Sequence, residues 1–259
     1  CTTMTTKENP SNERIHGGDS TEVDDELIDA SFCHVLPAAR LGQRLNSLEA
    51  FRATLANHDK MITKTKEYSI VVVTESSRQR ILQGLKHRGF GKGMMNSFGG
   101  KVQENETSVQ CASRELAEET GLKIPLDVMT QGHVGSMHYT FQDQENFEMI
   151  AHVFHVNITT ENSQQQQEES QTNTRKPPPF PIDPASIRGC DEITPRWIDH
   201  WFDIPLDNMF ADDSLWLTRL LLAFSKGKLL NVDGWFHFVE GGQEVNSISH
   251  YYLNVRPKR

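Results

Sequence analysis

GGKVQENETSVQCASRELAEETGL, which runs from Gly99 to Leu122, predicts a tight turn followed by a helix. Three of its glutamates, Glu115, Glu118 and Glu119, fall on one helical face because residues three and four apart are neighbours on a helix. Carboxylates this close repel each other, so they need either a solvated surface or a divalent cation that compensates their charge. The two leading glycines allow the backbone to bend tightly and to approach a ligand closely.

The ends of this helix are also marked in the sequence. Thr107 followed by Gln110 is typical of a capping box at the N-terminus. Gly121 favours a left-handed cap at the C-terminus. Apolar residues recur at helical spacing on another face: Val109, Ala112 and Leu116. We therefore expect one face of the helix to pack on the core and another to carry the acidic groups.

The order of residues in this stretch resembles the Nudix box, the motif of the Nudix hydrolase superfamily. Gly100 is followed at fixed distances by Glu106, by Arg114, Glu115 and Leu116, and by Glu118, Glu119, Gly121 and Leu122. The two glycines, four glutamates and one arginine are the seven fixed residues of the motif, and the two leucines are its apolar positions. Seven fixed residues at roughly 6% usage each would match by chance at about one site in 10⁸ to 10⁹. A merely solvated acidic helix would account for RELAEE, but not for the glycine and glutamate upstream.

Composition limits the class of protein. The 259 residues carry a formal net charge of −9, so the surface as a whole does not attract nucleic acid. Cys1, Cys33, Cys111 and Cys190 have no metal-ligand spacing, which favours reduced thiols in an intracellular protein. No apolar run has membrane-span length. We expect a cytoplasmic protein that is also present in the nucleus or the mitochondria.

Residues 1–65 are expected to form an N-terminal extension that is mostly disordered, because their first half is polar and acidic. Ser47 followed by LEAFRATLANHD predicts a short helix with an N-cap. This helix either packs on the domain or binds a partner, and packing is favoured. The acidity of the extension argues against a transit peptide.

Residues 66–259 are expected to form one domain, with a low-complexity insertion at 157–189. Apolar and β-branched runs predict strands, and an amphipathic run predicts a second helix. The predicted strands are 68–74 and 81–85 (a hairpin), 134–141 and 149–156 (joined by a turn at 142–146), 193–197, and 235–239 and 247–253 (a closing hairpin); the helix is 212–224. The order of elements predicts an α+β fold with a mixed sheet.

Further segments are similar to one branch of the superfamily, the MutT homologues that sanitise the nucleotide pool. These are GLKHRGFGKGMMNSFGGKVQENET, DEITPRW, and DNMFADDSLWLTRLLL followed by GWFHF. The resemblance implies a Nudix fold, in which a mixed β-sheet is sandwiched between helices. It also implies Mg²⁺-dependent hydrolysis, with Mn²⁺ as a substitute, of oxidised purine nucleoside triphosphates such as 8-oxo-dGTP and 2-hydroxy-dATP. The products are the monophosphate and pyrophosphate. We expect a monomer that binds neither nucleic acid directly nor a membrane.

The resemblance assigns the catalytic and metal-binding residues. Glu115, Glu118 and Glu119 are the catalytic residues and bind the metal, together with the Gly99 carbonyl and Glu192. Oxygen ligands of this kind suit a hard cation. One of the three helix glutamates, or Glu192, is the general base, and the choice stays open. Arg114 is expected to orient the glutamates, and Glu106 to brace the loop without binding metal.

The resemblance also assigns the substrate-binding residues: Ser69, Lys86, Phe90, Asn96, Phe98, Gly99, Gly100, Lys101, Tyr139, Met149, Phe210, Asp212 and Asp213. Adjacent carboxylates in a partly buried site raise one pKa, so one Asp of the pair can donate to a purine while the other accepts. The alternative is that Asp212 or Asp213 simply caps the following helix. Ser69 stands where the branch has Thr, and Met95 and Phe210 replace tryptophans, the second of which stacks on the base.

Two other functions remain open at this point. The first is a Nudix hydrolase of another diphosphate, such as a methylated purine nucleotide, a dinucleotide or a cap-like substrate. The second is a catalytically silent Nudix-fold module that binds a partner through its extension. The complete set of box glutamates argues against the second.

Overall fold

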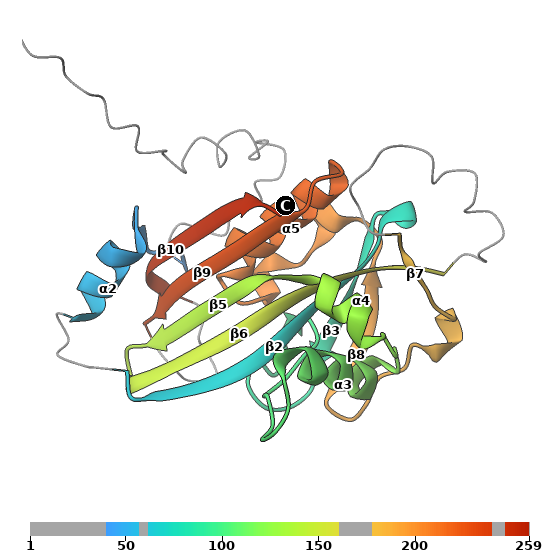
Figure 1. Cartoon of the computed structure of the whole chain (residues 1–259), viewed down its shortest axis with the longest axis horizontal. Coiled ribbons are helices and arrows are strands. Elements are labelled where there is room, and N and C mark those ends of the chain that lie inside the picture. Colours follow the sequence, from blue (N-terminus) through green and yellow to red (C-terminus); the bar gives the residue numbers. More distant parts are fainter. Residues whose placement is uncertain (1–39, 57–61, 161–177, 240–246, 259) are drawn as a thin grey trace, which may run out of the picture.

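The computed structural model describes residues 40–56, 62–160, 178–239 and 247–258 (Figure 1). The described helices are α2 (Leu48–Ala56), α3 (Ser108–Thr120), α4 (Leu126–Gln131) and α5 (Asp213–Ser225). The strands are β1 (Gln43–Arg44), β2 (Lys64–Glu75), β3 (Arg80–Lys86), β4 (Met95–Asn96), β5 (His133–Phe141), β6 (Gln144–Thr159), β7 (Phe180–Pro181), β8 (Ile193–Ile198), β9 (Leu230–Phe238) and β10 (Ile248–Pro257). The first half of the predicted extension, and residues 240–246 between the two strands of the predicted closing hairpin, lie outside the described residues.

One twisted sheet joins the described strands in the order β1-β10-β9-β5-β6-β2-β3-β4, with β7 paired to β6 and β8 to β3. β2 runs parallel to β6, and β5 runs parallel to β9. The β2/β3, β5/β6 and β9/β10 pairs are antiparallel, as the predicted hairpins require. The prediction of a mixed sheet is confirmed.

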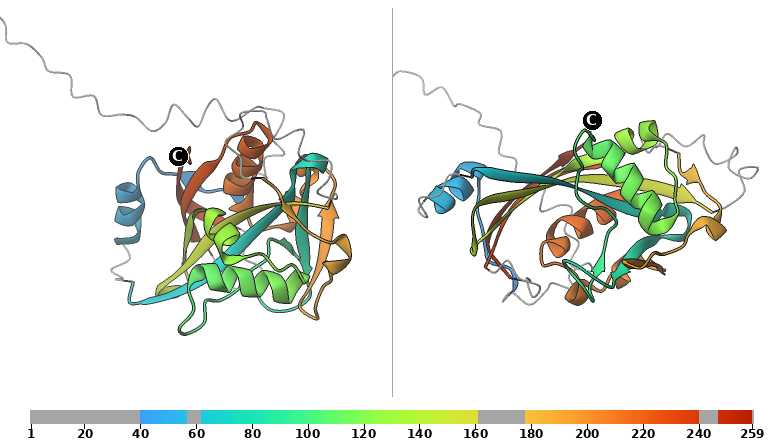
Figure 2. Two further views of the ribbon diagram at one scale, coloured as in Figure 1. Left: turned by 45° about the vertical axis from the view of Figure 1, so that its right-hand side comes forward. Right: turned by 90° about the horizontal axis from the view of Figure 1, so that it is seen from below.

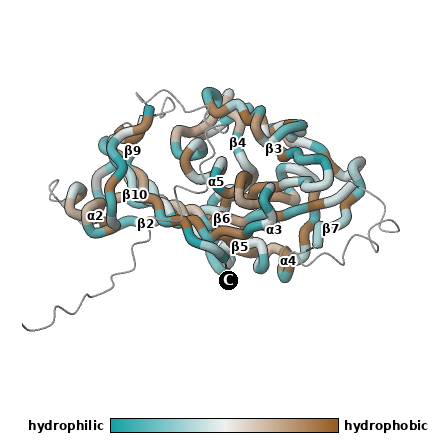
Figure 3. Tube along the Cα trace, turned by 90° about the horizontal axis from the view of Figure 1, so that it is seen from above, coloured by the Kyte–Doolittle hydropathy of each residue, from teal (hydrophilic) through white to brown (hydrophobic). Residues whose placement is uncertain are grey.

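Helices cover both faces of the sheet. Figure 2 shows α3 and α4 on one side and α5 on the other. Buried apolar residues therefore form two clusters: a larger one under α5, which includes Trp216, and a smaller one under α3, which includes Leu116. Hydrophobic residues run along α5 and the neighbouring strands in Figure 3. The predicted α+β class, with the sheet between helices, is confirmed.

Some details differ from the sequence predictions. β6 begins at Gln144, so the β5/β6 turn is shorter than the predicted 142–146. The described ends of the predicted insertion 157–189 contain regular structure, because β6 continues to Thr159 and β7 pairs beside it. α4 follows Pro125 and was not predicted, since six residues are too few for a clear periodicity. Cys111 and Cys190 form no disulfide. None of the described helices is long and apolar enough to cross a membrane.

The segment before β2 packs on the domain. β1 pairs in parallel with β10, and Ser47 Oγ accepts a hydrogen bond from the Ala50 amide at the start of α2, as its predicted N-cap role requires. Phe51 is only 2% exposed and contacts the ring of His250 at 5.2 Å between centroids. The helix after Ser47 and its packing are therefore as predicted.

Candidate active site

α3 places the acidic groups of the motif where its local sequence predicts them. The capping box forms: Thr107 Oγ1 accepts from the Gln110 amide at 3.2 Å, and Gln110 Oε1 accepts from the Thr107 amide at 2.8 Å. Gly121 ends the helix with a positive φ of 77°. Ala112 and Leu116 are buried against the sheet, which leaves Glu115 half-buried and Glu118 exposed, whereas Glu119 is buried.

Arg114 contacts three carboxylates of the acidic cluster. Its guanidinium contacts both carboxylate oxygens of Glu106 at 2.9 to 3.2 Å, and its Nη1 contacts Glu115 at 2.8 Å and Glu118 at 3.2 Å. The hydrogen bonds with Arg114 lower the pKa of Glu106, and the same bonds raise the pKa of Arg114. Such charge-assisted bonds fix side-chain orientation. Arg114 thus supplies the positive charge that keeps these carboxylates together.

Glu119 and Glu192 lie in different environments. Glu119 is 6% exposed, and its Oε2 accepts a hydrogen bond from the Gly99 amide at 2.8 Å. Burial raises the pKa of Glu119 to about 7, against the effect of that bond. Glu192 is more exposed and contacts Lys86 at 3.2 Å and Arg88 at 3.8 Å.

Glycine is required at both positions of the turn before α3. Gly99 has a φ of 138°, and a Cβ there would lie 2.1 Å from the Ser69 carbonyl oxygen. At Gly100 a Cβ would lie 2.4 Å from Glu115 Oε1. The backbone therefore runs directly against β2 on one side and against the acidic cluster on the other.

The donor set suits a hard divalent cation by its chemistry, because it consists of carboxylates and a backbone carbonyl. Within the described ranges, however, no group of three or more His, Cys, Asp or Glu side chains is gathered as it would be around a metal ion. The contacts above explain this arrangement. Glu115 and Glu118 are turned toward Arg114, Glu119 toward Gly99, and Glu192 toward two basic side chains.

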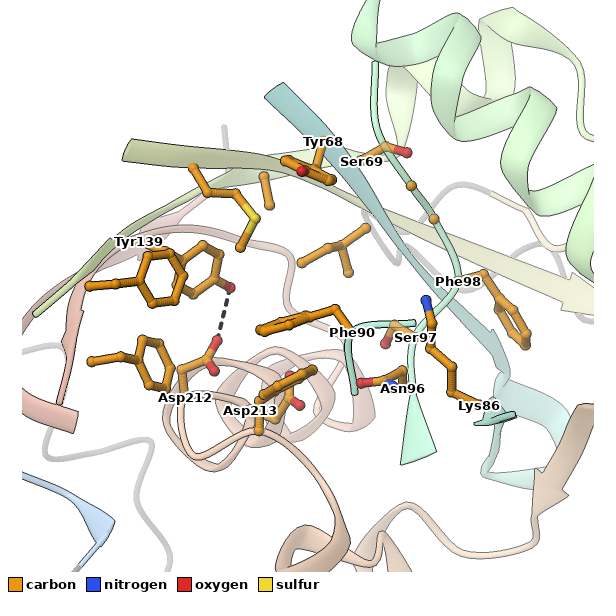
Figure 4. A pocket seen from close by; sticks show the side chains of 18 residues that line it. Tyr68, Ser69, Lys86, Phe90, Asn96, Ser97, Phe98, Tyr139, Asp212 and Asp213 are labelled. Carbon is orange, nitrogen blue, oxygen red and sulfur yellow. Dashed lines mark hydrogen bonds between the residues drawn. The ribbon is translucent and has the colours of Figure 1, made fainter. Parts of the chain in front are cut away.

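A pocket opens beside the Gly99–Gly100 turn, between β2, β5, β6 and the start of α5 (Figure 4). It is lined by twelve of the thirteen substrate-binding residues predicted from the sequence: Ser69, Lys86, Phe90, Asn96, Phe98, Gly99, Gly100, Tyr139, Met149, Phe210, Asp212 and Asp213. Lys101 is exposed and lies outside this lining, and Met95 is a buried core residue that does not line the pocket.

Six further lining residues were not predicted: Tyr68, Ile70, Ser97, Phe141, Ala151 and Phe238. A signal for several of them is present in the sequence. Tyr68 with Ile70, Phe141 with Tyr139, and Ala151 with Met149 are two residues apart, and side chains at that spacing on a strand point to the same face. A strand residue that is predicted to line the pocket therefore indicates that the residue two positions away lines it as well.

The two adjacent aspartates have different surroundings. Asp212 Oδ2 accepts hydrogen bonds from Tyr139 Oη at 2.9 Å and from Trp216 Nε1 at 3.0 Å. Burial raises the pKa of Asp212 to about 6, while these two donors oppose that shift. The pKa of Asp213 is also raised well above its usual value, first by burial and then by the charge of Asp212. Burial therefore favours the neutral form of both carboxyl groups, and the two donors favour the charged form of Asp212.

The helix-cap alternative is wrong for Asp212. It stands at the N-cap position of α5, but its side chain makes no capping hydrogen bond. The carboxylate turns instead into the pocket, toward Tyr139 (Figure 4).

Two phenylalanines stack on each other at the pocket entrance. The rings of Phe90 and Phe210 are 5.0 Å apart between centroids and 13° from parallel, and Phe90 is 45% exposed. Phe90 lies between Gly89 and Gly91, both with positive φ. A Cβ at Gly91 would lie 3.0 Å from the Phe210 ring and 3.1 Å from Asn96 Nδ2, so this loop lies close against the pocket.

The chain is similar in sequence to known proteins. It is 34% identical over 158 residues to the oxidized purine nucleoside triphosphate hydrolase of Danio rerio, covering 61% of this chain and 80% of that protein. It is 32% identical over 163 residues to the protein of the same name from Mus musculus, covering 62% and 82%. The crystal structure of the MutT protein from Bacillus halodurans is similar over 73% of this chain and 97% of that one, with 17% identity and a TM-score of 0.46. The model of the NUDIX domain matches residues 64–188, and with these relatives it establishes that the chain belongs to the NUDIX family and is a Nudix hydrolase.

Proposed function

We propose that this Nudix hydrolase cleaves oxidised purine nucleoside triphosphates, such as 8-oxo-dGTP and 2-hydroxy-dATP, to the monophosphate and pyrophosphate. The observation that carries the proposal is the Asp212/Asp213 pair, two adjacent buried carboxyl groups whose pKa values are both raised by burial, in a pocket that adjoins the acidic helix α3. The names of the two relatives support the same substrate class.

The base would be held at the aspartate end of the pocket. Neutral Asp213 can donate a hydrogen bond to a base acceptor, while charged Asp212 accepts one from a base donor. Asn96, whose amide can do both, lies on β4 in the same lining. Phe210 offers its ring for stacking, with less area than a tryptophan. One pocket can in this way read the hydrogen-bonding patterns of both 8-oxoguanine and 2-hydroxyadenine.

The triphosphate would lie at the other end, over the Gly99–Gly100 turn. The Gly99 carbonyl and four carboxylates, Glu115, Glu118, Glu119 and Glu192, would hold Mg²⁺ there. Bound Mg²⁺ neutralises phosphate charge and lowers the pKa of a water molecule. Lys86, which lines the pocket and contacts Glu192, supplies a further positive charge to the phosphates. The general base is one of the three helix glutamates or Glu192.

A substrate panel tests this function. The protein is incubated with 8-oxo-dGTP, 2-hydroxy-dATP, dGTP and dATP in Mg²⁺, with a chelator control, and kcat/KM is compared between substrates. We expect higher kcat/KM for the oxidised forms and pyrophosphate as the second product. Equal or absent turnover of the oxidised forms would refute the proposal. Preferred turnover of another diphosphate, or nucleotide binding without any turnover, would identify the alternative that replaces it.

A further inference from the structure

Arg40 contacts the loop that carries the base-reading residues, although it lies far outside the residues that match the NUDIX domain. Arg40 Nη2 donates to the Met209 carbonyl oxygen at 2.9 Å, and Nη1 donates to the Asp207 carbonyl oxygen at 3.3 Å. Burial lowers the pKa of the guanidinium, and the nearby Asp207 carboxylate opposes that shift. The Met209 side chain is fully buried, so this contact is made at the edge of the core.

The loop from Leu206 to Ala211 leads directly into the pocket. It begins with a 3₁₀ turn, Leu206–Asn208, and ends one residue before Asp212. Phe210, next to the carbonyl that Arg40 binds, lines the pocket and stacks on Phe90. On another side, Asn208 Nδ2 donates to the Gly93 carbonyl oxygen at 3.2 Å. Arg40 and Asn208 thus hold the loop at two different places.

Arg40 itself is fixed by the chain that follows it. Gly42 lies so close to β10 that a Cβ would be 2.0 Å from the Ser249 carbonyl oxygen. Leu41 packs on the core, and the Leu45 amide donates to the Tyr251 carbonyl oxygen at 2.7 Å. The segment is therefore anchored to β10, and Arg40 reaches from this anchor to the loop before α5.

We propose that Arg40 is a positioning residue. It holds the loop before α5 so that the side chains of Phe210, Asp212 and Asp213 are placed to contact the purine. The segment that precedes the NUDIX match would thereby take part in nucleotide selection. The inference rests on the proposed function for the identity of the base, but the contact between Arg40 and the loop can be tested without any nucleotide.

The first experiment is hydrogen–deuterium exchange on the full-length, nucleotide-free protein. Arg40→Met keeps an apolar stem and removes both donors. A hydrogen bond from a charged donor is strong enough that its loss should speed exchange in residues 206–213 by about tenfold. Arg52→Met, on the exposed side of α2, is the matched control and should leave this region unchanged. Unchanged exchange in Arg40→Met would overturn the proposal.

The second experiment separates positioning from stability. With the nucleotide that has the highest kcat/KM, Arg40→Met should raise KM by about tenfold while kcat changes less than about threefold, because the acidic helix is not touched. Arg40→Lys should recover part of the loss, and Gly42→Ala, which displaces the anchor, should reproduce it. A lower melting temperature with an unchanged KM would overturn the proposal. If no nucleotide is turned over, the proposed function fails, and hydrogen exchange alone decides the role of Arg40.

Discussion

Replacing Asp212 by Asn should stabilise the protein at neutral pH and weaken its recognition of the base. Asp212 is buried, and its pKa is raised from 3.8 to about 6 mainly by desolvation. The two values differ by about two pH units, and each corresponds to about 1.4 kcal/mol, so carrying this charge in the folded state costs about 3 kcal/mol. The Asn amide oxygen can still accept from Tyr139 and Trp216, so the variant removes the charge without leaving those donors unpaired.

The sign of the pH dependence follows from linkage. Between the unfolded pKa of 3.8 and the folded pKa of about 6, the folded protein binds more protons than the unfolded chain, so this group lowers stability as pH rises. Below about pH 4 the variant and the wild type should therefore be equally stable. Above about pH 7 the variant should be more stable by about 3 kcal/mol, which for a chain of this size raises the melting temperature by about 6 to 12 °C.

The assay is urea unfolding followed by tryptophan fluorescence across this pH range. The control is Asp199→Asn, which removes an exposed carboxylate of the same domain. In parallel, kcat/KM of Asp212→Asn for the oxidised substrate should fall by about tenfold to a hundredfold, because a charged acceptor becomes an amide. If the free energies of unfolding of variant and wild type ran parallel between the two pKa values, the burial of a charged Asp212 would be refuted.

Three further outcomes are expected. Tyr139→Phe removes a hydrogen bond that lowers the pKa of Asp212, so that pKa should rise and the acid limb of kcat/KM against pH should move to higher pH; an unmoved limb would contradict this. Glu118→Gln should cut kcat by orders of magnitude while nucleotide binding, measured by calorimetry, survives; full activity would remove its assignment as a catalytic metal ligand. Phe210→Trp should lower KM several-fold through a larger stacking area, and an equal KM would mean that the base does not stack there.

The acidic helix could be predicted from the sequence because its determinants are local. The cap at Thr107, the stop at Gly121 and the apolar face all lie within one stretch, and α3 forms as they require. The strands could be predicted for the same reason, since the runs of apolar and β-branched residues that indicate them are also local. Helix α4 is too short to produce such a pattern.

The distribution of charge in the site could not be predicted in the same way. The sequence places Asp212 and Asp213 side by side, but it does not reveal that Tyr139 and Trp216 both donate to one oxygen of Asp212. Those donors come from β5 and from the next turn of α5, and they favour the charged form of Asp212. The contact of Arg40 with the loop before α5 joins residues 167 and 169 positions apart, and no local pattern indicates it.

Strand β2 explains why the acidic helix α3 and the pocket are adjacent. Tyr68 and Ile70 point into the pocket, and the backbone of the residues beside them bonds to the turn before α3. The Ser69 amide donates to the Gly100 carbonyl oxygen at 2.9 Å, and the Val71 amide donates to the Phe98 carbonyl oxygen at 2.7 Å. Successive residues of a strand point to opposite faces of the sheet. A shift of one residue in this register would therefore turn the side chains of Tyr68 and Ile70 out of the pocket, and it would also move the turn away from the acidic helix. The pairing between β2 and the turn before α3 therefore fixes the position of the pocket relative to the acidic helix. The glycines of the turn permit this pairing because a Cβ at Gly99 would clash with β2.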